Sequence, residues 1–104
     1  MNNIKYKIGT SLNKNRFLVL VIYDISNDRR RNKMVKFLNS FGIRVQESAF
    51  ECILNQKAYN KLLKEIKLYR TDADYLRVYK MFGNTEISSW DEIGINRYEE
   101  VIVV

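Results

Sequence analysis

The chain contains no histidine, no proline and a single cysteine, Cys52. Without histidine there is no imidazole base, which excludes serine–histidine and cysteine–histidine nucleophile systems and the H-E-x-x-H zinc proteases. One cysteine forms neither an internal disulfide nor a zinc site of several thiolates, so we expect a reducing compartment. Carboxylates, hydroxyls and basic groups are left to carry any chemistry.

Long apolar segments are also missing. The longest apolar run, at residues 17–23, has seven residues, whereas a membrane span needs about 20. No small-residue cleavage site follows this run, which argues against a signal peptide. We therefore expect a soluble, cytoplasmic protein.

Positive charge is abundant and unevenly distributed. The 104 residues are enough for one domain and carry a net charge of +6. Residues 1–70 hold 15 basic and 5 acidic side chains, whereas residues 71–104 hold 3 and 7. This basic excess favours a polyanionic partner, either nucleic acid or an anionic membrane surface; the alternative is a solvated basic face.

The first half of the chain predicts a leader, a strand and a helix. Residues 1–15 are polar and aperiodic, so we expect a flexible N-terminal leader before a single domain at residues 16–104. The apolar run at 17–23 is typical of a strand buried on both faces. Helical periodicity begins at Arg29, and we expect Gly42 to end that helix in a left-handed conformation.

The second half predicts three or four more strands and a second helix. Residues 43–54 alternate as one strand, or as two short strands with a bend near residues 46–47. Asn55 can cap the second helix. Residues 75–82 and 99–104 read as strands, separated by a polar loop at residues 83–97.

This order predicts an α+β fold, a ferredoxin-like βαββαβ sandwich with an extra C-terminal strand. Each helix carries one apolar stripe, so both can cover the same face of a sheet. The other face is also apolar along residues 17–23. A monomer would expose it, so we expect a partner or a homodimer on that side.

Asp24, directly after the first strand, is the main candidate for chemistry. A carboxylate at the end of a buried strand is held rigidly, as a divalent-metal ligand should be. It could instead cap the next helix, but Asn27 and Asp28 lie nearer to the helix start. Mg²⁺ often takes one or two carboxylates plus substrate phosphate, and a two-fold dimer would bring two copies of Asp24 together. The candidate reaction is phosphodiester hydrolysis by a metal-activated water.

Basic side chains follow Asp24 in the first turns of the predicted helix: Arg29, Arg30, Arg31 and Lys33. Cations at a helix N-terminus oppose the helix dipole, whereas phosphate is favoured there. Their position therefore favours phosphate binding over a merely solubilising role.

At these residues the chain resembles the Cas2 family, small CRISPR adaptation nucleases that act with the CRISPR spacer integrase. The resemblance runs from Phe17 to Val104. Its most specific segments are LVIYDISND at 20–28, RRRNK at 29–33, FGIRVQESAFE at 41–51 and LRVY at 76–79.

The resemblance implies roles for individual residues. The family's metal-binding and catalytic aspartate maps onto Asp24. Its nucleic-acid-binding residues map onto Tyr23, Arg31, Lys33 and Arg44, to which the helix position adds Arg30. The family's serine and phenylalanine of the following strand map onto Ser48 and Phe50, which we expect to be supporting residues. Ser26, in the segment after Asp24, is a further supporting candidate.

The resemblance also implies a ferredoxin-like homodimer that exchanges its C-terminal strand and cleaves RNA or DNA with Mg²⁺. Its expected partners are DNA or RNA and the spacer integrase, with no membrane. Two alternatives remain open. One is a non-catalytic DNA-binding scaffold of the integration complex, and the other is a related toxin-type ribonuclease.

Overall fold

The computed structural model describes residues 4–8, 15–81 and 85–90. In chain order the elements are β1 (Ile4–Ile8), β2 (Phe17–Asp24), α1 (Asp28–Asn39), β3 (Gly42–Gln46), β4 (Ala49–Leu54), α2 (Gln56–Ile66), the short 3-10 helix η1 (Lys67–Tyr69), β5 (Tyr75–Met81) and β6 (Thr85–Ser89). From β2 to β5 the order is βαββαβ, which confirms the predicted ferredoxin-like fold.

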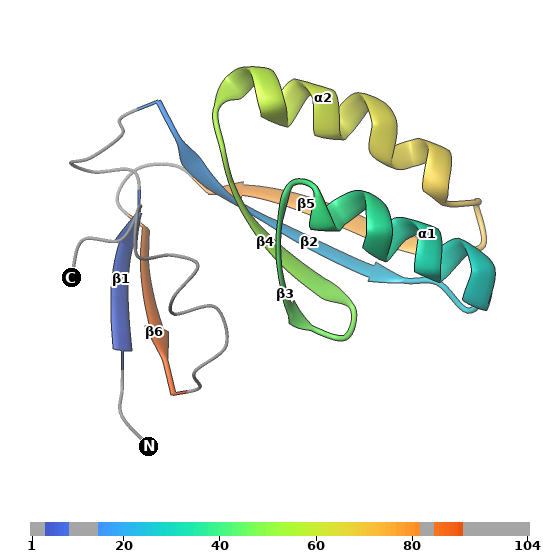
Figure 1. Cartoon of the computed structure of the whole chain (residues 1–104), viewed down its shortest axis with the longest axis horizontal. Helices are drawn as coiled ribbons and strands as arrows, with labels where there is room; N and C mark the ends of the chain where they lie inside the picture. The colour runs from blue at the N-terminus through green and yellow to red at the C-terminus, as the bar shows by residue number, and fades with distance from the viewer. Residues whose placement is uncertain (1–3, 9–14, 82–84, 91–104) are drawn as a thin grey trace.

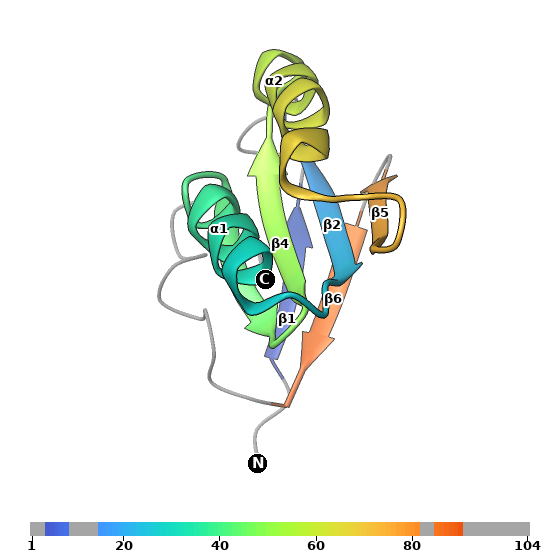
Figure 2. The ribbon, with the colours of Figure 1, turned by 90° about the vertical axis from the view of Figure 1, so that its right-hand side faces the viewer.

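A four-stranded antiparallel sheet with two helices on one face forms the body of the molecule (Figure 1). The strand order is β3-β4-β2-β5, so β2 and β4 are central and β5 is an edge. Viewed from the side, α1 and α2 cover the same face (Figure 2). The opposite face of the sheet carries no helix in the described part of the chain, in agreement with the sequence prediction.

Alternation along β2 divides its side chains between these two faces. Val19, Val21 and Tyr23 lie in the core and are at most 1% exposed. Met34 and Leu38 of α1 and Leu62 and Ile66 of α2 complete this core from the helical side, together with Phe50, Cys52 and Leu54 of β4. The residues that alternate with them, Leu18, Leu20, Ile22 and Asp24, therefore belong to the open face.

Both helices begin at an asparagine. The Asn27 side chain accepts a hydrogen bond from the Arg30 backbone N–H at 2.9 Å, and Asn55 accepts one from Ala58 at 2.8 Å. Each bond satisfies one of the free N–H groups of a first helical turn. Asn27 is thus the cap of α1, and Asp24 is not needed for that role.

Gly42 has a different role from the predicted left-handed helix cap. The helix ends at Ser40 in a right-handed conformation, and Gly42 begins β3 opposite Cys52. A Cβ at Gly42 would lie 2.6 Å from Cys52 Sγ, 2.8 Å from Cys52 Cα, and against the Glu51 carbonyl oxygen. Glycine is required here because β4 approaches closely.

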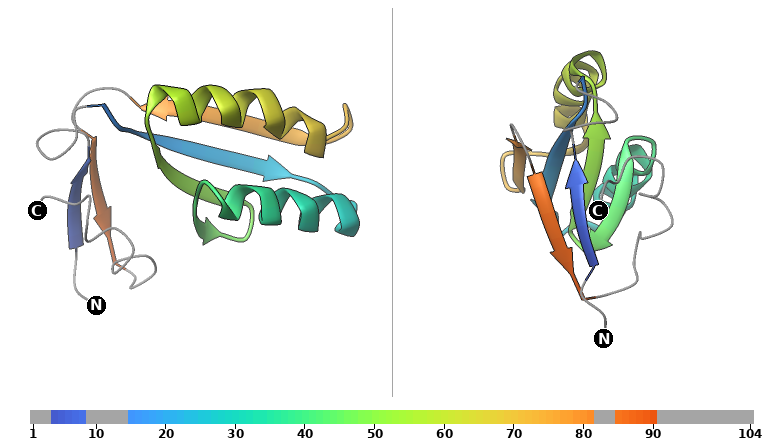
Figure 3. Two further views of the ribbon diagram at one scale, coloured as in Figure 1. Left: turned by 45° about the horizontal axis from the view of Figure 1, so that its top comes forward. Right: turned by 90° about the vertical axis from the view of Figure 1, so that its left-hand side faces the viewer.

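Strands β1 and β6 form a separate two-stranded antiparallel ribbon (Figure 3). Ile4 pairs with Ser89, Tyr6 with Ile87, and Ile8 with Thr85. Both strands differ from the expectation from the sequence, which placed residues 1–15 in a flexible leader and residues 83–97 in a loop. The sequence of β1, IKYKI, does alternate between apolar and polar residues, whereas that of β6, TEISS, does not. The predicted strand at 99–104 lies outside the described residues.

Neither of the described helices combines the length and apolar character that crossing a membrane requires.

Candidate functional site

Asp24 is the last residue of β2 and is exposed at the end of the sheet. Its Cα partner across the ladder is Tyr75, the first residue of β5. Because Val21 and Tyr23 point to the helices, Asp24 points to the open face with Ile22. Among the described residues no group of three or more acidic, cysteine or histidine side chains could enclose a metal ion. The described residues of one chain therefore do not enclose a metal ion at Asp24 by themselves.

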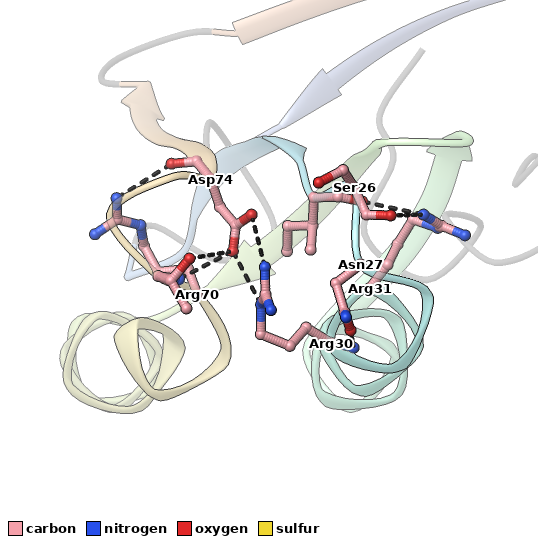
Figure 4. Close-up of polar contacts among 8 residues, drawn as sticks. Ser26, Asn27, Arg30, Arg31, Arg70 and Asp74 are labelled. Atoms are coloured by element: carbon pink, nitrogen blue, oxygen red, sulfur yellow. Dashed lines mark hydrogen bonds and ion pairs between the residues drawn. The ribbon is translucent and has the colours of Figure 1, made fainter.

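The loop that follows Asp24 is fixed by Arg31 of α1 (Figure 4). The Arg31 guanidinium donates hydrogen bonds to the carbonyl oxygens of Ile25 at 3.1 Å and Ser26 at 3.4 Å, and it also contacts the Asp28 carboxylate. Ile25 itself is buried. These contacts hold the chain in a defined path from the end of β2 to α1, while the Ser26 residue is exposed.

Arg30 lies on another side of α1 and is bound to Asp74 (Figure 4). Its Nε donates to one carboxylate oxygen of Asp74 at 3.2 Å and its Nη2 to the other at 3.1 Å. The Asp74 side chain is 1% exposed, whereas that of Arg30 is 34% exposed. This is the two-pronged geometry that guanidinium and carboxylate groups favour. Arg30 therefore ties α1 to the start of β5.

Further donors complete the surroundings of Asp74. The backbone N–H of Thr71 donates to the carboxylate at 2.9 Å and its hydroxyl at 3.3 Å, while Arg70 donates to the Asp74 carbonyl oxygen at 3.1 Å. The hydrogen bond from Arg30, followed by that from Thr71, lowers the pKa of Asp74 below its ordinary value. No role for residues 71–74 was expected from the sequence. The signal for one is an acidic residue three positions after a threonine, directly before an alternating strand.

Tyr23 and Phe50 belong to the core beneath this site. Tyr23 is 1% exposed and Phe50 is fully buried, with their ring centres 6.4 Å apart. The Tyr23 hydroxyl donates to the Glu47 carbonyl oxygen at 3.2 Å, and its backbone N–H donates to that of Ser48 at 3.1 Å. Burial raises the pKa of Tyr23, and the charge of Arg44 acts in the opposite direction. Neither ring has the exposed surface that a direct nucleic-acid contact needs.

Arg44 supports the same turn from β3. Its Nε and Nη2 donate to the Glu47 carbonyl oxygen at 3.1 and 2.6 Å, so Glu47 receives hydrogen bonds from both Arg44 and Tyr23. Ser48, half-buried, offers its carbonyl oxygen to β2. The tight turn between β3 and β4 is thereby attached to the end of β2, next to Asp24.

The predicted site residues thus fall into groups. Asp24 is exposed at the strand end. Arg31 organises the loop that contains Ser26, while Tyr23, Arg44, Ser48 and Phe50 fix the neighbouring turn. Arg30 pairs with Asp74, and Lys33 is exposed on α1. Arg30, Arg31 and Arg44, three of the four basic residues predicted to bind nucleic acid, therefore form hydrogen bonds within the chain that fix the segments around Asp24.

Cys52 takes no part in this arrangement. It is buried in β4, and burial, followed by the charge of Glu51, raises its pKa to about 12. The thiol stays protonated at neutral pH, so it is not a nucleophile.

The family described as CRISPR associated protein Cas2 matches residues 17–87, which include β2 to β5 and Asp24. The chain belongs to the Cas2 family. A Cas2 relative from Synechocystis, named a CRISPR-associated endoribonuclease, is 38% identical over 91 residues, which are 85% of this chain and 99% of the relative.

Solved Cas2 structures agree with the fold. Streptococcus pyogenes Cas2 matches with a TM-score of 0.56 and 26% identity, over 64% of this chain and 86% of that chain. A chain of a partial Cas6-RT-Cas1–Cas2 complex matches with a TM-score of 0.52 and 27% identity, over 64% of this chain and 79% of that chain. The β1 strand precedes the residues that the family matches.

Proposed function

We propose that this chain is a CRISPR adaptation protein and an Mg²⁺-dependent endonuclease that cleaves RNA at Asp24. The observation that carries this proposal is the contrast between Asp24 and its neighbours. Asn27 caps the helix, Arg31 fixes the loop and Asp74 neutralises Arg30, while Asp24 stays exposed at the end of a rigid strand. The names of relatives as endoribonucleases support RNA as the substrate.

One Asp24 carboxylate alone is a weak cation ligand. Mg²⁺ retains several waters and is commonly held by one or two carboxylates together with substrate phosphate. A two-fold dimer through the open face would supply a second Asp24. Among the described residues, Asp24 would then be the one side chain of each copy that binds the ion. When bound, Mg²⁺ supplies an activated water and stabilises charge on the phosphate.

The protein's own residues position the substrate and hold Asp24 in place. Arg31 and the Tyr23–Arg44–Glu47 contacts fix the two turns beside the carboxylate. The exposed basic residues of the helices, among them Lys33 and Lys61, attract a polyanion. No histidine is present to move protons.

A second function, a non-catalytic scaffold, is favoured by the structural match to a chain of a Cas1–Cas2-containing complex. In this reading the same basic surface holds DNA for the spacer integrase and Asp24 has no catalytic role. The partner would be the integrase in both cases.

Replacing Asp24 by asparagine separates the two functions. Asp24→Asn keeps the side-chain shape and removes the charge, so the rate of RNA cleavage should fall by two or more orders of magnitude, and Mg²⁺ binding measured by calorimetry should be lost. Asp72→Asn is the matched control, because Asp72 is a fully exposed acidic residue of the loop before β5 and contacts Arg70. It should cleave at the wild-type rate.

Cleavage by Asp24→Asn at the wild-type rate would show that Asp24 is not the catalytic residue. If neither the wild type nor the variant cleaves, and both bind DNA and the integrase, the scaffold is the correct function.

A further inference from the structure

The ion pair between Arg30 and Asp74 closes a ring of contacts, called here the contact circuit, around the end of β2 where Asp24 lies. We infer that Asp74 is a positioning residue for Asp24: acting through Arg30, it fixes the end of β2 so that the Asp24 carboxylate is held where it binds the metal ion. This role rests on the proposed function. It assigns Asp74 a part in the reaction in addition to its part in folding.

The first half of the contact circuit joins Asp24 to Asp74. Asp24 is paired across the ladder with Tyr75, and Asp74 directly precedes Tyr75. The backbone N–H of Asp74 donates to the Thr71 carbonyl oxygen at 2.9 Å, and the backbone N–H of Thr71 donates to the Asp74 carboxylate at 2.9 Å. Asp74 is therefore fixed to its own turn and, through the next residue, to the strand that borders Asp24.

The second half of the contact circuit returns to Asp24 through the first turn of α1. Arg30 donates to both carboxylate oxygens of Asp74, at 3.2 and 3.1 Å. The next residue, Arg31, donates to the carbonyl oxygens of the two residues that directly follow Asp24. Because the two arginines are neighbours in one helical turn, a shift of Arg30 is passed on to the loop after Asp24.

The ion pair is directional, and it lies on the helical side of the sheet (Figure 4). A two-pronged guanidinium–carboxylate pair fixes the orientation of both groups, whereas apolar packing has no preferred direction. The Asp74 side chain is 1% exposed. Since Tyr75 points to the open face, Asp74 points to the helices. A dimer formed through the open face therefore leaves the pair intact.

The position of Asp24 depends on its backbone. Asp24 is exposed, and among the described residues no side chain holds its carboxylate directly. The backbone at the end of β2 is what the contact circuit fixes. A displacement of about 1 Å of a reacting or ligating group can lower a rate by about 100-fold. A looser contact circuit should therefore slow the reaction without changing the residues that bind RNA.

Two variants separate positioning from stability. Asp74→Asn breaks the pair and leaves the charge of Arg30 unpaired. Arg30→Met/Asp74→Asn also removes that charge, so its melting temperature should return to within about 2 °C of the wild type. In both variants, kcat for RNA cleavage should fall by about 10- to 100-fold at a temperature where all proteins are folded. KM for RNA should stay within about twofold of the wild type.

A stability control and a measurement that does not depend on cleavage complete the test. Ile66→Val shortens a side chain of the α2 core that is 3% exposed. It should lower the melting temperature by about 2–5 °C and leave kcat within about twofold. In hydrogen exchange of the metal-free protein, the amides of residues 24–26 should exchange at least about 10-fold faster in Arg30→Met/Asp74→Asn, whereas the buried amides of β4 should keep their protection.

The outcomes are distinct. If Arg30→Met/Asp74→Asn regains both the stability and the kcat of the wild type, Asp74 serves folding alone and the positioning role is overturned. An equal loss of kcat in Ile66→Val also overturns it, because the rate would then follow stability. A higher KM with unchanged kcat in the double variant would mean that Arg30 contacts RNA itself, which again overturns the role.

A wild type that does not cleave RNA would refute the nuclease and leave the metal-free measurement to decide on Asp74. Faster exchange at residues 24–26 in the double variant would then support positioning of the Asp24 segment by Asp74. Unchanged exchange would overturn it.

Discussion

Asp74 and Arg30 illustrate at the scale of single residues why charge alone gave an incomplete picture of the site. The three consecutive arginines at the start of α1 oppose the helix dipole, which favoured an external phosphate. In the structure, Asp74 and Asp28 supply the negative charge instead. Asp74 is 44 residues away from Arg30 along the chain, so no local pattern pointed to the pair. Asp24 was predictable because its signal is local: a carboxylate directly after a buried strand.

Asp74→Asn should lower the melting temperature by about 5 °C or more, because it leaves Arg30 without its countercharge next to a buried amide. Asp72→Asn is the control. Asp72 is fully exposed and its contact with Arg70 spans 3.7 Å, so its loss should shift the melting temperature by no more than about 1 °C. Equal effects of the two changes, measured by calorimetry, would contradict the structural role of Asp74.

The pH dependence of this effect has a defined sign. Folding lowers the pKa of Asp74 from its ordinary value of 3.8. The ionised carboxylate therefore stabilises the fold at pH values above about 4, and this contribution is lost as the pH falls through the lower, folded-state pKa. The difference in unfolding free energy between wild type and Asp74→Asn should be constant above about pH 5 and should narrow below pH 4, in urea titrations at each pH.

At the scale of elements, the close approach of β3 and β4 makes Gly42 a sensitive position. Gly42→Ala places a methyl group against the Glu51 carbonyl and Cys52, and β4 is too well packed to retreat. The free energy of unfolding should fall by about 1–3 kcal/mol. Gln46→Ala, an exposed change at the other end of β3, should cost less than about 0.5 kcal/mol. A stable Gly42→Ala protein would mean that the two strands are further apart.

The β1–β6 ribbon yields a second prediction at this scale. Deleting residues 1–8 removes β1, so the backbone amides of β6 lose their described partners. In hydrogen exchange, the amides of Thr85–Ser89 should lose protection, while those of β2 and β4 should not. Deleting residues 1–3 alone leaves β1 intact and serves as the control. Protection of β6 that survives the longer deletion would show that the ribbon does not depend on β1.

The ribbon also shows which elements could not be predicted from the sequence. Apolar runs and helical stripes identified β2 to β5 and both helices, and Asn55 marked the start of α2, because each of these signals lies within a few residues. The pairing of β1 with β6 joins segments about 80 residues apart. The alternation of β1 covers only five residues within a polar segment, and β6 has no alternation, so the pairing is what identifies the ribbon. The predicted role of Gly42 was wrong for a related reason. Glycine is required at this position because β4 approaches closely, and not because the preceding helix ends there.

At the scale of the whole molecule, the fold leaves one face of the sheet without a helix over it in the described part of the chain, and this face is available for assembly. The helices cover one face only (Figure 2), and Leu20, Ile22 and Ile53 are half-buried on the other. The apolar run at residues 17–23 predicted this two-sided character. The structure adds that Asp24 lies on the same face, so a dimer formed through this face, with its two-fold axis near the end of β2, would bring two copies of Asp24 together.

Leu20→Lys tests this assembly. In one chain, the new ammonium group lies across the ladder from Glu51, so the monomer should fold. In a dimer that packs through the open faces, each new lysine and the Glu51 opposite it would be removed from water, and the cost of desolvating these charges should raise the dissociation constant by at least about 100-fold. Leu63→Lys makes the same change at a residue of α2 that is 40% exposed and should leave the dimer intact. Light scattering over a range of concentrations measures the dissociation constants of both variants.

The rate of RNA cleavage by Leu20→Lys should fall together with dimerisation if the metal needs both copies of Asp24. A variant that is monomeric and fully active would place the complete catalytic site within one chain.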